Sequence, residues 1–288
     1  MTPNNNLSPL AFYDSVDKQN HRKDYAFGEA YPLYTPSRRI LPFQIIRSTR
    51  AIAAIPYAAL HNLDGSVFLD ITAPMISGGL EVVSHSSLGF DVIKYPDPAV
   101  MAITTPEGQY YLEIYDGTQR WYSEVFIIVD QVYSCLQIEY GSSDTLFFSD
   151  GALDFADDFK FRVYLPTQLG RPEYPFTEDI QERDGYTFTE KQISEKTFKF
   201  NFLAPEFLLD ALRLVRMMDS IRIRNKGEVY QASTFLLTPR WEDGGFVASV
   251  EAEFQCDTVV KKTGSIGELP VFPAGIGTAI IGDTFIIS

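Results

Sequence analysis

Cysteine and histidine are scarce in this sequence, and their scarcity removes several kinds of site. The 288 residues contain 2 cysteines, Cys135 and Cys256, and 3 histidines, His21, His61 and His85. The cysteines lie far apart and form neither a disulfide framework nor a paired zinc spacing, so we expect two buried free thiols. No histidine has another histidine or a cysteine at metal-ligand spacing, so we expect no metal site of that kind.

Basic residues and long apolar runs are also few. The chain carries 24 Lys and Arg against 38 Asp and Glu, which gives a net charge of −14. Such a surface repels the phosphates of duplex DNA and of anionic membranes, so we expect no sequence-specific nucleic-acid binding. The first twenty residues lack the pattern of a secretory signal, and no apolar run approaches the length of a membrane span. We expect a protein that is kept in a reducing cytosol and does not insert into a membrane.

Catalytic and nucleotide-binding motifs are absent too. No G-x-S-x-G elbow and no G-x-x-x-x-G-K-[ST] loop occurs, and the stretch GIGTAIIG lacks the third glycine spacing of a dinucleotide fingerprint. These absences predict no catalytic residue, no cofactor and no enzyme activity.

What the chain has in abundance is apolar and aromatic sequence broken by turn residues. Hydrophobic residues make up 45% of the chain and aromatic residues 14%, enough to bury a substantial core. The spacing of turns predicts a mainly β protein with two β-sandwich domains, Ig-like or jelly-roll-like, and the second domain carries one packed helix. We assign residues 1–59 to an N-terminal arm and edge strands, 60–140 to the first sandwich, 141–262 to the second β domain and 263–288 to a C-terminal arm.

The best-defined hairpin is YYLEIY-DG-TQRWYSEV, which turns at Asp116 and Gly117. Its aromatic residues admit two interpretations. They form cross-strand pairs that stabilise the hairpin, or they form a platform that stacks on sugar rings. The residues of this alternative glycan-stacking surface are Tyr110, Tyr111, Trp121 and Tyr122.

Three segments with a period of two predict strands in the second domain, namely FKFRVYL, EKTFKFNF and FVASVEAEF. The last of these places Phe246, Ala248, Val250, Ala252 and Phe254 on the inner face. Residues 205–219 have apolar residues at helical spacing and predict a helix, with the stripe Phe207, Leu208, Ala211, Leu212, Val215 and Met218 facing the core. IRIRNKGEVYQAS, after the helix, predicts a hairpin that turns at residues 225–227.

Two acidic clusters are candidates for a metal site and for a catalytic site. Asp150, Asp154, Asp157 and Asp158 are candidates for calcium, although their spacing departs from the calcium-loop pattern. Glu178, Asp179, Glu182 and Asp184 are candidates for the paired carboxylates of a glycosidase, although a solvated loop is the better interpretation. Arg171 and Arg183 are expected to pair with these acids and to hold the loop against a neighbouring molecule.

The C-terminal segment TAIIGDTFIIS is too apolar to be left in water. We expect it to dock as a strand, either on the chain's own sheet or on a neighbouring subunit. The residues of this candidate interaction segment are Ile280, Ile281, Phe285, Ile286 and Ile287.

Several stretches resemble a known family when they are taken together: YAFGEAYPLYTP, YYLEIYDGTQRWYSEVF, LGRPEYPF, RDGYTFTEKQISEKTFKFNFLAPEFLLDALRLVRMMD and ASVEAEFQCDTVVKK. They are similar to virion or tail-associated structural proteins of tailed phages and prophages of Bacteroidetes, including gut phages of the crAss-like kind. The resemblance extends from about residue 25 to residue 262 and includes no catalytic motif.

The resemblance implies a virion component that is made in the bacterial host cytoplasm and located in the tail or neck of the particle. Our leading hypothesis is a ring-forming tail, neck or baseplate protein. Its expected partners are copies of itself and other tail or portal-proximal proteins. The alternative hypothesis is a tail module that binds host glycan through the aromatic platform.

Overall fold

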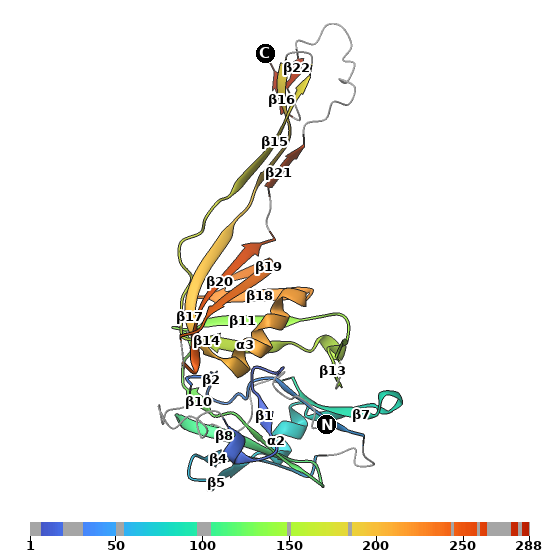
Figure 1. Ribbon diagram of the computed structural model, residues 1–288, viewed down its shortest axis with the longest axis vertical. Coiled ribbons are helices and arrows are strands. Elements are labelled where there is room, and N and C mark those ends of the chain that lie inside the picture. The colour runs from blue at the N-terminus through green and yellow to red at the C-terminus, as the bar shows by residue number, and fades with distance from the viewer. Residues whose placement is uncertain are drawn as a thin grey trace.

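The computed structural model describes residues 7–19, 31–49, 55–96, 105–148, 151–183, 186–242, 245–257, 260–263, 278–281 and 284–287. Strands dominate these residues, and neighbouring strands run antiparallel apart from one parallel pair. The mainly β fold expected from the sequence is therefore confirmed. Figure 1 shows an elongated molecule with an N-terminal unit at one end, a six-stranded sheet in the middle and a narrow β-ribbon that projects from the other end.

The N-terminal unit contains a seven-stranded sheet and a three-stranded sheet. The strands of the larger sheet are β1 (Phe12–Tyr13), β2 (Tyr34–Pro36), β4 (Tyr57–Asn62), β5 (Val67–Asp70), β8 (Gly108–Tyr115), β9 (Arg120–Ser123) and β10 (Phe126–Val129). The strands of the smaller sheet are β3 (Phe43–Ser48), β7 (Phe90–Tyr95) and β6 (Glu81–His85), in that order. The rings of Phe12 and Phe43 lie 4.7 Å apart, so side chains of the two sheets pack against each other.

The predicted hairpin forms as expected. Strands β8 and β9 pair with Ile114 opposite Trp121, and Gly117 has a φ of 88°, which favours glycine. The carboxylate of Asp116 accepts hydrogen bonds from the backbone N–H groups of Thr118 and Gln119, which fixes the turn.

Residues 1–59 were expected to be an arm with edge strands, and only the second part of that expectation holds. Strands β1 and β2 lie at the ends of the larger sheet, and β3 lies at one edge of the smaller sheet. However, Leu10, Leu33 and Phe43 are completely buried, so this segment is part of the core and not a free arm. Its apolar residues, held extended between prolines, complete both sheets.

The C-terminal unit is built on one antiparallel six-stranded sheet. In sheet order its strands are β14 (Phe161–Leu165), β11 (Leu136–Gly141), β18 (Ser220–Asn225), β19 (Glu228–Arg240), β20 (Val247–Cys256) and β17 (Thr197–Pro205). Strand β11 pairs with β14 and β18, so this sheet begins at Leu136, before the boundary that we placed after residue 140. The hairpin of β18 and β19 turns at Lys226 and Gly227, as predicted.

The three strands of period two bury the faces that the sequence predicted, with one exception. The phenylalanines of β14 and β17 point inward, and so do the alternate residues Ala248, Val250, Ala252 and Phe254 of β20. Phe246 lies just before β20 and is 52% exposed, so its predicted inward position is wrong. Because Phe246 precedes the ladder that begins at Val247, the alternation of the strand does not extend to it.

The predicted helix is confirmed as α3 (Glu206–Leu212), which continues as the 3₁₀ turn η4 (Arg213–Met217). Every residue of its predicted apolar stripe is buried. The Tyr140 hydroxyl donates a hydrogen bond of 3.4 Å to the carbonyl of Ala211, which ties the helix to β11.

The remaining short elements are η1 (Val16–Lys18), α2 (Thr72–Ser77), η2 (Ser86–Leu88), β12 (Leu146–Phe148), β13 (Gly151–Leu153) and η3 (Ala156–Asp158).

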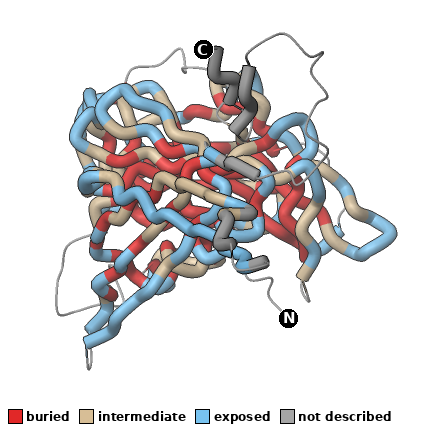
Figure 2. The backbone as a smooth tube through the Cα atoms, turned by 90° about the horizontal axis from the view of Figure 1, so that it is seen from above, coloured by how far each residue is buried: buried red, intermediate tan, exposed pale blue. Residues whose placement is uncertain are grey.

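The two units share one core, and together we call them the body. A single cluster of buried apolar side chains extends from Leu7 to Cys256 and includes residues of both large sheets. Strands β2 and β14 lie side by side where the units meet. Figure 2 shows buried backbone running through the middle of the molecule and exposed segments forming its outer loops.

The N-terminal unit also buries charged groups. The guanidinium of Arg47 is completely buried, with Nη1 3.0 Å from the Asp116 carboxylate and Nε 3.5 Å from that of Asp91. The imidazole of His61 lies 2.7 Å from the Glu113 carboxylate, which also pairs with Arg120. Each of these buried carboxylates therefore lies beside a basic group, which offsets the cost of removing it from water.

Candidate functional site

The most exposed ordered feature of the molecule is a three-stranded antiparallel sheet, which we call the ribbon. It consists of β15 (Phe176–Arg183), β16 (Tyr186–Ser194) and β21 (Val260–Thr263), in that order. It extends from the six-stranded sheet away from the N-terminal unit, and β16 leads directly into β17 (Figure 1). The acidic segment that we interpreted as a solvated loop is thus strand β15, and that interpretation is wrong.

The ribbon exposes apolar side chains on both of its edge strands. Phe176 and Ile180 of β15 are 59% and 55% exposed, and Val260 of β21 is 71% exposed. Residues 176–182 are exposed on both faces of the strand, so β15 packs against no core. A narrow sheet with no covered face is marginally stable by itself, so these residues favour contact with another molecule.

The root of the ribbon is anchored to the edge of the six-stranded sheet. Glu173 and Thr197 exchange two backbone hydrogen bonds of 2.8 and 2.9 Å, and the Glu173 carboxylate lies 2.9 Å from the ammonium of Lys199. The Thr167 hydroxyl donates to the carbonyl of Asn201 at 2.7 Å. Residues 167–173 therefore cover the edge of β17, and the ribbon is held at its base.

Three of the four carboxylates proposed for glycoside cleavage lie on one strand. Glu178, Asp179 and Glu182 lie on β15, and Asp184 lies outside the described residues. The Glu178 carboxylate accepts hydrogen bonds from Gln192 Nε2 at 2.7 Å and Thr189 Oγ1 at 2.9 Å, and these bonds lower its pKa. An exposed carboxylate with a lowered pKa is a poor general acid, so the geometry gives no support to this chemistry.

The two arginines expected to bind these acids are not brought together. Arg171 is exposed in the segment that covers β17, at the root of the ribbon. Arg183 is the last residue of β15, and its side chain lies outside the described residues. An eight-residue strand separates the two positions, so they do not form one cluster.

The proposed glycan platform is part of the core. Tyr110, Tyr111 and Trp121 are 5%, 3% and 2% exposed, and Tyr122 is half-buried. Tyr111 stacks on the ring of His61 at 5.0 Å, and Trp121 lies opposite Ile114 in the hairpin. A buried ring has no free face for a sugar, so the glycan-stacking surface assigned to these residues is wrong.

In the acidic cluster proposed for calcium, the described aspartates lie beside basic side chains. The buried carboxylate of Asp154 lies 3.3 Å from His85 and 3.7 Å from Lys94. Asp158 is exposed and pairs with Lys160 at 2.9 Å. Asp150 lies outside the described residues. Among the residues described, no three histidine, cysteine or acidic side chains come together as a cation site.

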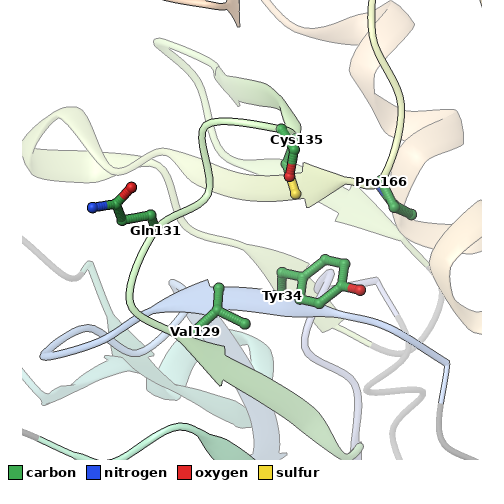
Figure 3. A pocket seen from close by; sticks show the side chains of 6 residues that line it. Tyr34, Val129, Gln131, Cys135 and Pro166 are labelled. Atoms are coloured by element: carbon green, nitrogen blue, oxygen red, sulfur yellow. The ribbon is translucent and has the colours of Figure 1, made fainter.

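A pocket of about 340 Å³ lies where the two units meet. It is lined by Tyr34, Val129, Gln131, Ser134, Cys135 and Pro166. Figure 3 shows the side chains of Tyr34 and Val129 below it and those of Cys135 and Pro166 above it. Burial raises the pKa of the Cys135 thiol, which disfavours the nucleophilic thiolate. Cys135 is therefore not activated as a nucleophile in this pocket.

The two thiols differ from each other in burial. Cys256 is buried, as predicted, whereas Cys135 is only half-buried, so the prediction for Cys135 is wrong. Cys135 immediately precedes β11, in the connection that leads from β10.

The apolar C-terminal segment forms strands, as predicted. They are β22 (Thr278–Ile281) and β23 (Thr284–Ile287), which pair with each other so that Ile280 lies opposite Phe285. In the described part of the chain this hairpin joins no other sheet, so the expected docking on the chain's own sheet is not seen. The side chains of Ile280, Ile281, Phe285, Ile286 and Ile287 lie outside the described residues.

Sequence reasoning missed the ribbon, although one signal for it was present. TEDIQER has polar residues on both faces of a strand, which is typical of a strand that no core covers.

No helix in the described residues has the length and apolar character needed to cross a bilayer. The chain matches no protein-family model and no curated protein sequence.

Proposed function

We propose that this protein is a structural component of a phage virion that assembles with copies of itself into a ring in the tail, neck or baseplate. Other tail or portal-proximal proteins contact the same ring. The observation that carries the proposal is the ribbon, a projecting three-stranded sheet that exposes apolar side chains on a body with a complete core.

The contrast between body and ribbon supports an assembly role. The buried apolar cluster of the body contains no described residue of β15, β16 or β21, so the ribbon contributes nothing to that core. An exposed sheet with two open edges is a common docking element, because another chain can add a strand to either edge. Its root is fixed by the hydrogen bonds of Glu173 to Thr197, so the ribbon is presented in a defined direction.

The resemblance to tail-associated phage proteins supports the location. It covers both the ribbon, in RDGYTFTEKQISEKTF, and the helix and strands of the body.

The proposal is tested first on the purified full chain. Mass photometry is expected to give a symmetric oligomer, and electron microscopy is expected to show rings. A variant in which residues 177–193 are replaced by a two-residue Asn-Gly turn joins Phe176 to Ser194, which already lie opposite each other. This variant should keep the circular dichroism of the body and become monomeric.

The location is tested on particles. Mass spectrometry of purified virions should find this chain at the copy number of a ring. A chain that is absent from virions contradicts the virion role, and a full chain that stays monomeric at all concentrations contradicts ring formation.

A further inference from the structure

The two edges of the ribbon carry charges of opposite sign. Strand β15 forms one edge and carries three acids, Glu178, Asp179 and Glu182, against one base, Arg183, at its end. Strand β21 forms the other edge with the sequence VKKT, in which Lys261 and Lys262 are the only charged residues. An acidic edge and a basic edge on one molecule favour association of the acidic edge of one copy with the basic edge of the next.

Both edges are open for pairing. In the described residues, β15 and β21 each pair with β16 alone. The edge of β17 in the same molecule is covered by residues 167–173, whereas neither ribbon edge has a corresponding cover among the described residues. Open edges of this kind are protected in most proteins, because their free N–H and C=O groups pair with other chains.

A residue of β15 and a residue of β21 are at the same level of the ribbon when both lie opposite the same residue of β16. Phe176 and Val260 both lie opposite Ser194, and Glu178 and Lys262 both lie opposite Gln192. Residues that are two positions apart along a strand lie on the same face of the sheet. When two ribbons lie edge to edge at the same level, exposed Phe176 meets Val260 of the next copy and Glu178 meets its Lys262. One face then gains an apolar contact and an ion pair together.

The strand directions are compatible with a closed ring. Because β15 and β21 are both antiparallel to β16, they are parallel to each other. Copies related by rotation about an axis along the strands therefore bring β15 of one copy beside β21 of the next in parallel. Such a contact uses different surfaces on the two molecules, and it closes into a ring when the rotation closes.

Resting on the ring assembly proposed above, we propose that the occupant of the β15 edge is a second copy of this chain. Its strand β21 pairs in parallel with β15, so that Glu178 is level with Lys262 of that copy and Asp179 is level with the next residue, Thr263. Each copy uses its acidic edge for one neighbour and its basic edge for the other.

Charge reversal tests this pairing directly. The variant E178K/D179K makes both ribbon edges basic, and K261E/K262E makes both edges acidic. Each variant alone should lose the oligomer, with affinity between copies weakened roughly 100-fold or more by like charges at the edge. An equimolar mixture should recover assembly, because every basic edge again meets an acidic one.

A matched control separates the edge effect from net charge. The variant D144K/E228K makes the same change in net charge as E178K/D179K, but at exposed positions of the C-terminal unit. It should assemble like the unchanged chain. Circular dichroism should show that all variants remain folded. If both ribbon variants assemble normally, or if both fail and their mixture does not recover, the pairing is wrong although the ring itself stands.

A cross-link gives a second, geometric test. Within one copy, positions 178 and 262 are separated by β16, about 9.6 Å at two strand spacings, which a disulfide cannot bridge. The variant E178C/K262C, in a C135S background, should therefore give a covalent ladder of chains on oxidation. E178C alone meets no cysteine on the β21 edge of the next copy and should give no ladder. Absence of the ladder while the ring persists overturns the pairing, and a monomeric unchanged chain overturns the ring and the pairing together.

Discussion

Strands β16 and β17 form one nearly continuous run of chain, yet β16 belongs to the ribbon and β17 to the six-stranded sheet of the body. Thr197 to Pro205 alternates between core and surface on the six-stranded sheet, with Phe198, Phe200 and Phe202 inward. On the ribbon, β15 beside β16 is exposed on both faces. Hydrogen bonding to a neighbour is therefore enough to define a strand, whereas burial requires a second layer, which helix α3 supplies only to the body.

The body itself combines two kinds of core. The C-terminal unit is stabilised by aromatic packing, such as the stacked rings of Phe198 and Phe254 at 5.3 Å. The N-terminal unit adds buried ion pairs around Arg47. Removal of a buried ring or of one partner of a buried ion pair destabilises the folded body. Substitutions in the body should therefore affect folding, whereas substitutions in the exposed ribbon should affect assembly.

The largest effect is expected from Arg47→Ala. This substitution leaves the carboxylates of Asp91 and Asp116 buried without their cation, at a cost of about 3–5 kcal/mol in the free energy of unfolding. Arg213→Ala is the control, because its pair with Asp210 is exposed and contributes about 1 kcal/mol at most. Urea denaturation measures both, and equal losses would contradict the role of burial.

Trp121→Ala should be nearly as damaging. Its ring is 2% exposed, so the cavity costs about 3–5 kcal/mol and lowers the melting temperature. Tyr122→Ala, at a half-buried position on the same strand, should cost clearly less. A Trp121→Ala protein that stays as stable as the unchanged chain would restore the possibility of an exposed platform.

A smaller effect is expected from Ile138→Val in β11. Ile138 is completely buried and lies between Val163 of β14 and Ile223 of β18. Loss of one methylene should cost about 0.5–1.5 kcal/mol by chemical denaturation. Val229→Ala, at a half-exposed position of β19, is the control and should change stability less.

On the ribbon, Phe176→Ser with Ile180→Thr should change the free energy of unfolding by only about 0.5 kcal/mol, because both side chains are already exposed. The same variant should weaken the oligomer in mass photometry. Phe198→Ser, just beyond the ribbon on β17, should instead unfold the body, since its ring is 4% exposed. A ribbon variant that unfolds would show that the ribbon belongs to the body's cooperative unit.

The smallest effect concerns Asp219 at the surface. Its carboxylate accepts hydrogen bonds from the Ser143 backbone N–H at 2.9 Å, the Ser143 hydroxyl at 2.7 Å and the Ser142 hydroxyl at 3.1 Å, and these lower its pKa. Because the folded pKa is depressed, the contribution to stability is complete above the ordinary carboxyl pKa and is lost as the pH falls through the folded value. Carbon NMR titration should give a higher midpoint for Asp219 in Ser143→Ala, with Asp70 as an unchanged reference. Identical midpoints would contradict the hydrogen-bond explanation.

Local patterns in the sequence determined the elements of this fold. Alternating phenylalanines predicted β14 and β17, the helical spacing from Phe207 to Met218 predicted α3, and Asp116-Gly117 predicted the turn between β8 and β9. These features depend on backbone geometry and on one apolar face, both of which a short window of residues specifies.

Only the tertiary structure decided which faces are covered. Strand β8 buries Tyr111 and Glu113 as well as Tyr110 and Leu112, so an aromatic row that suits a sugar surface belongs to the core. Strand β15 has similar hydrogen bonds to its neighbour but packs against no layer, so its acids and apolar residues remain exposed. Burial depends on elements that are distant in the chain. The residues of a strand alone therefore do not determine whether another layer packs against it.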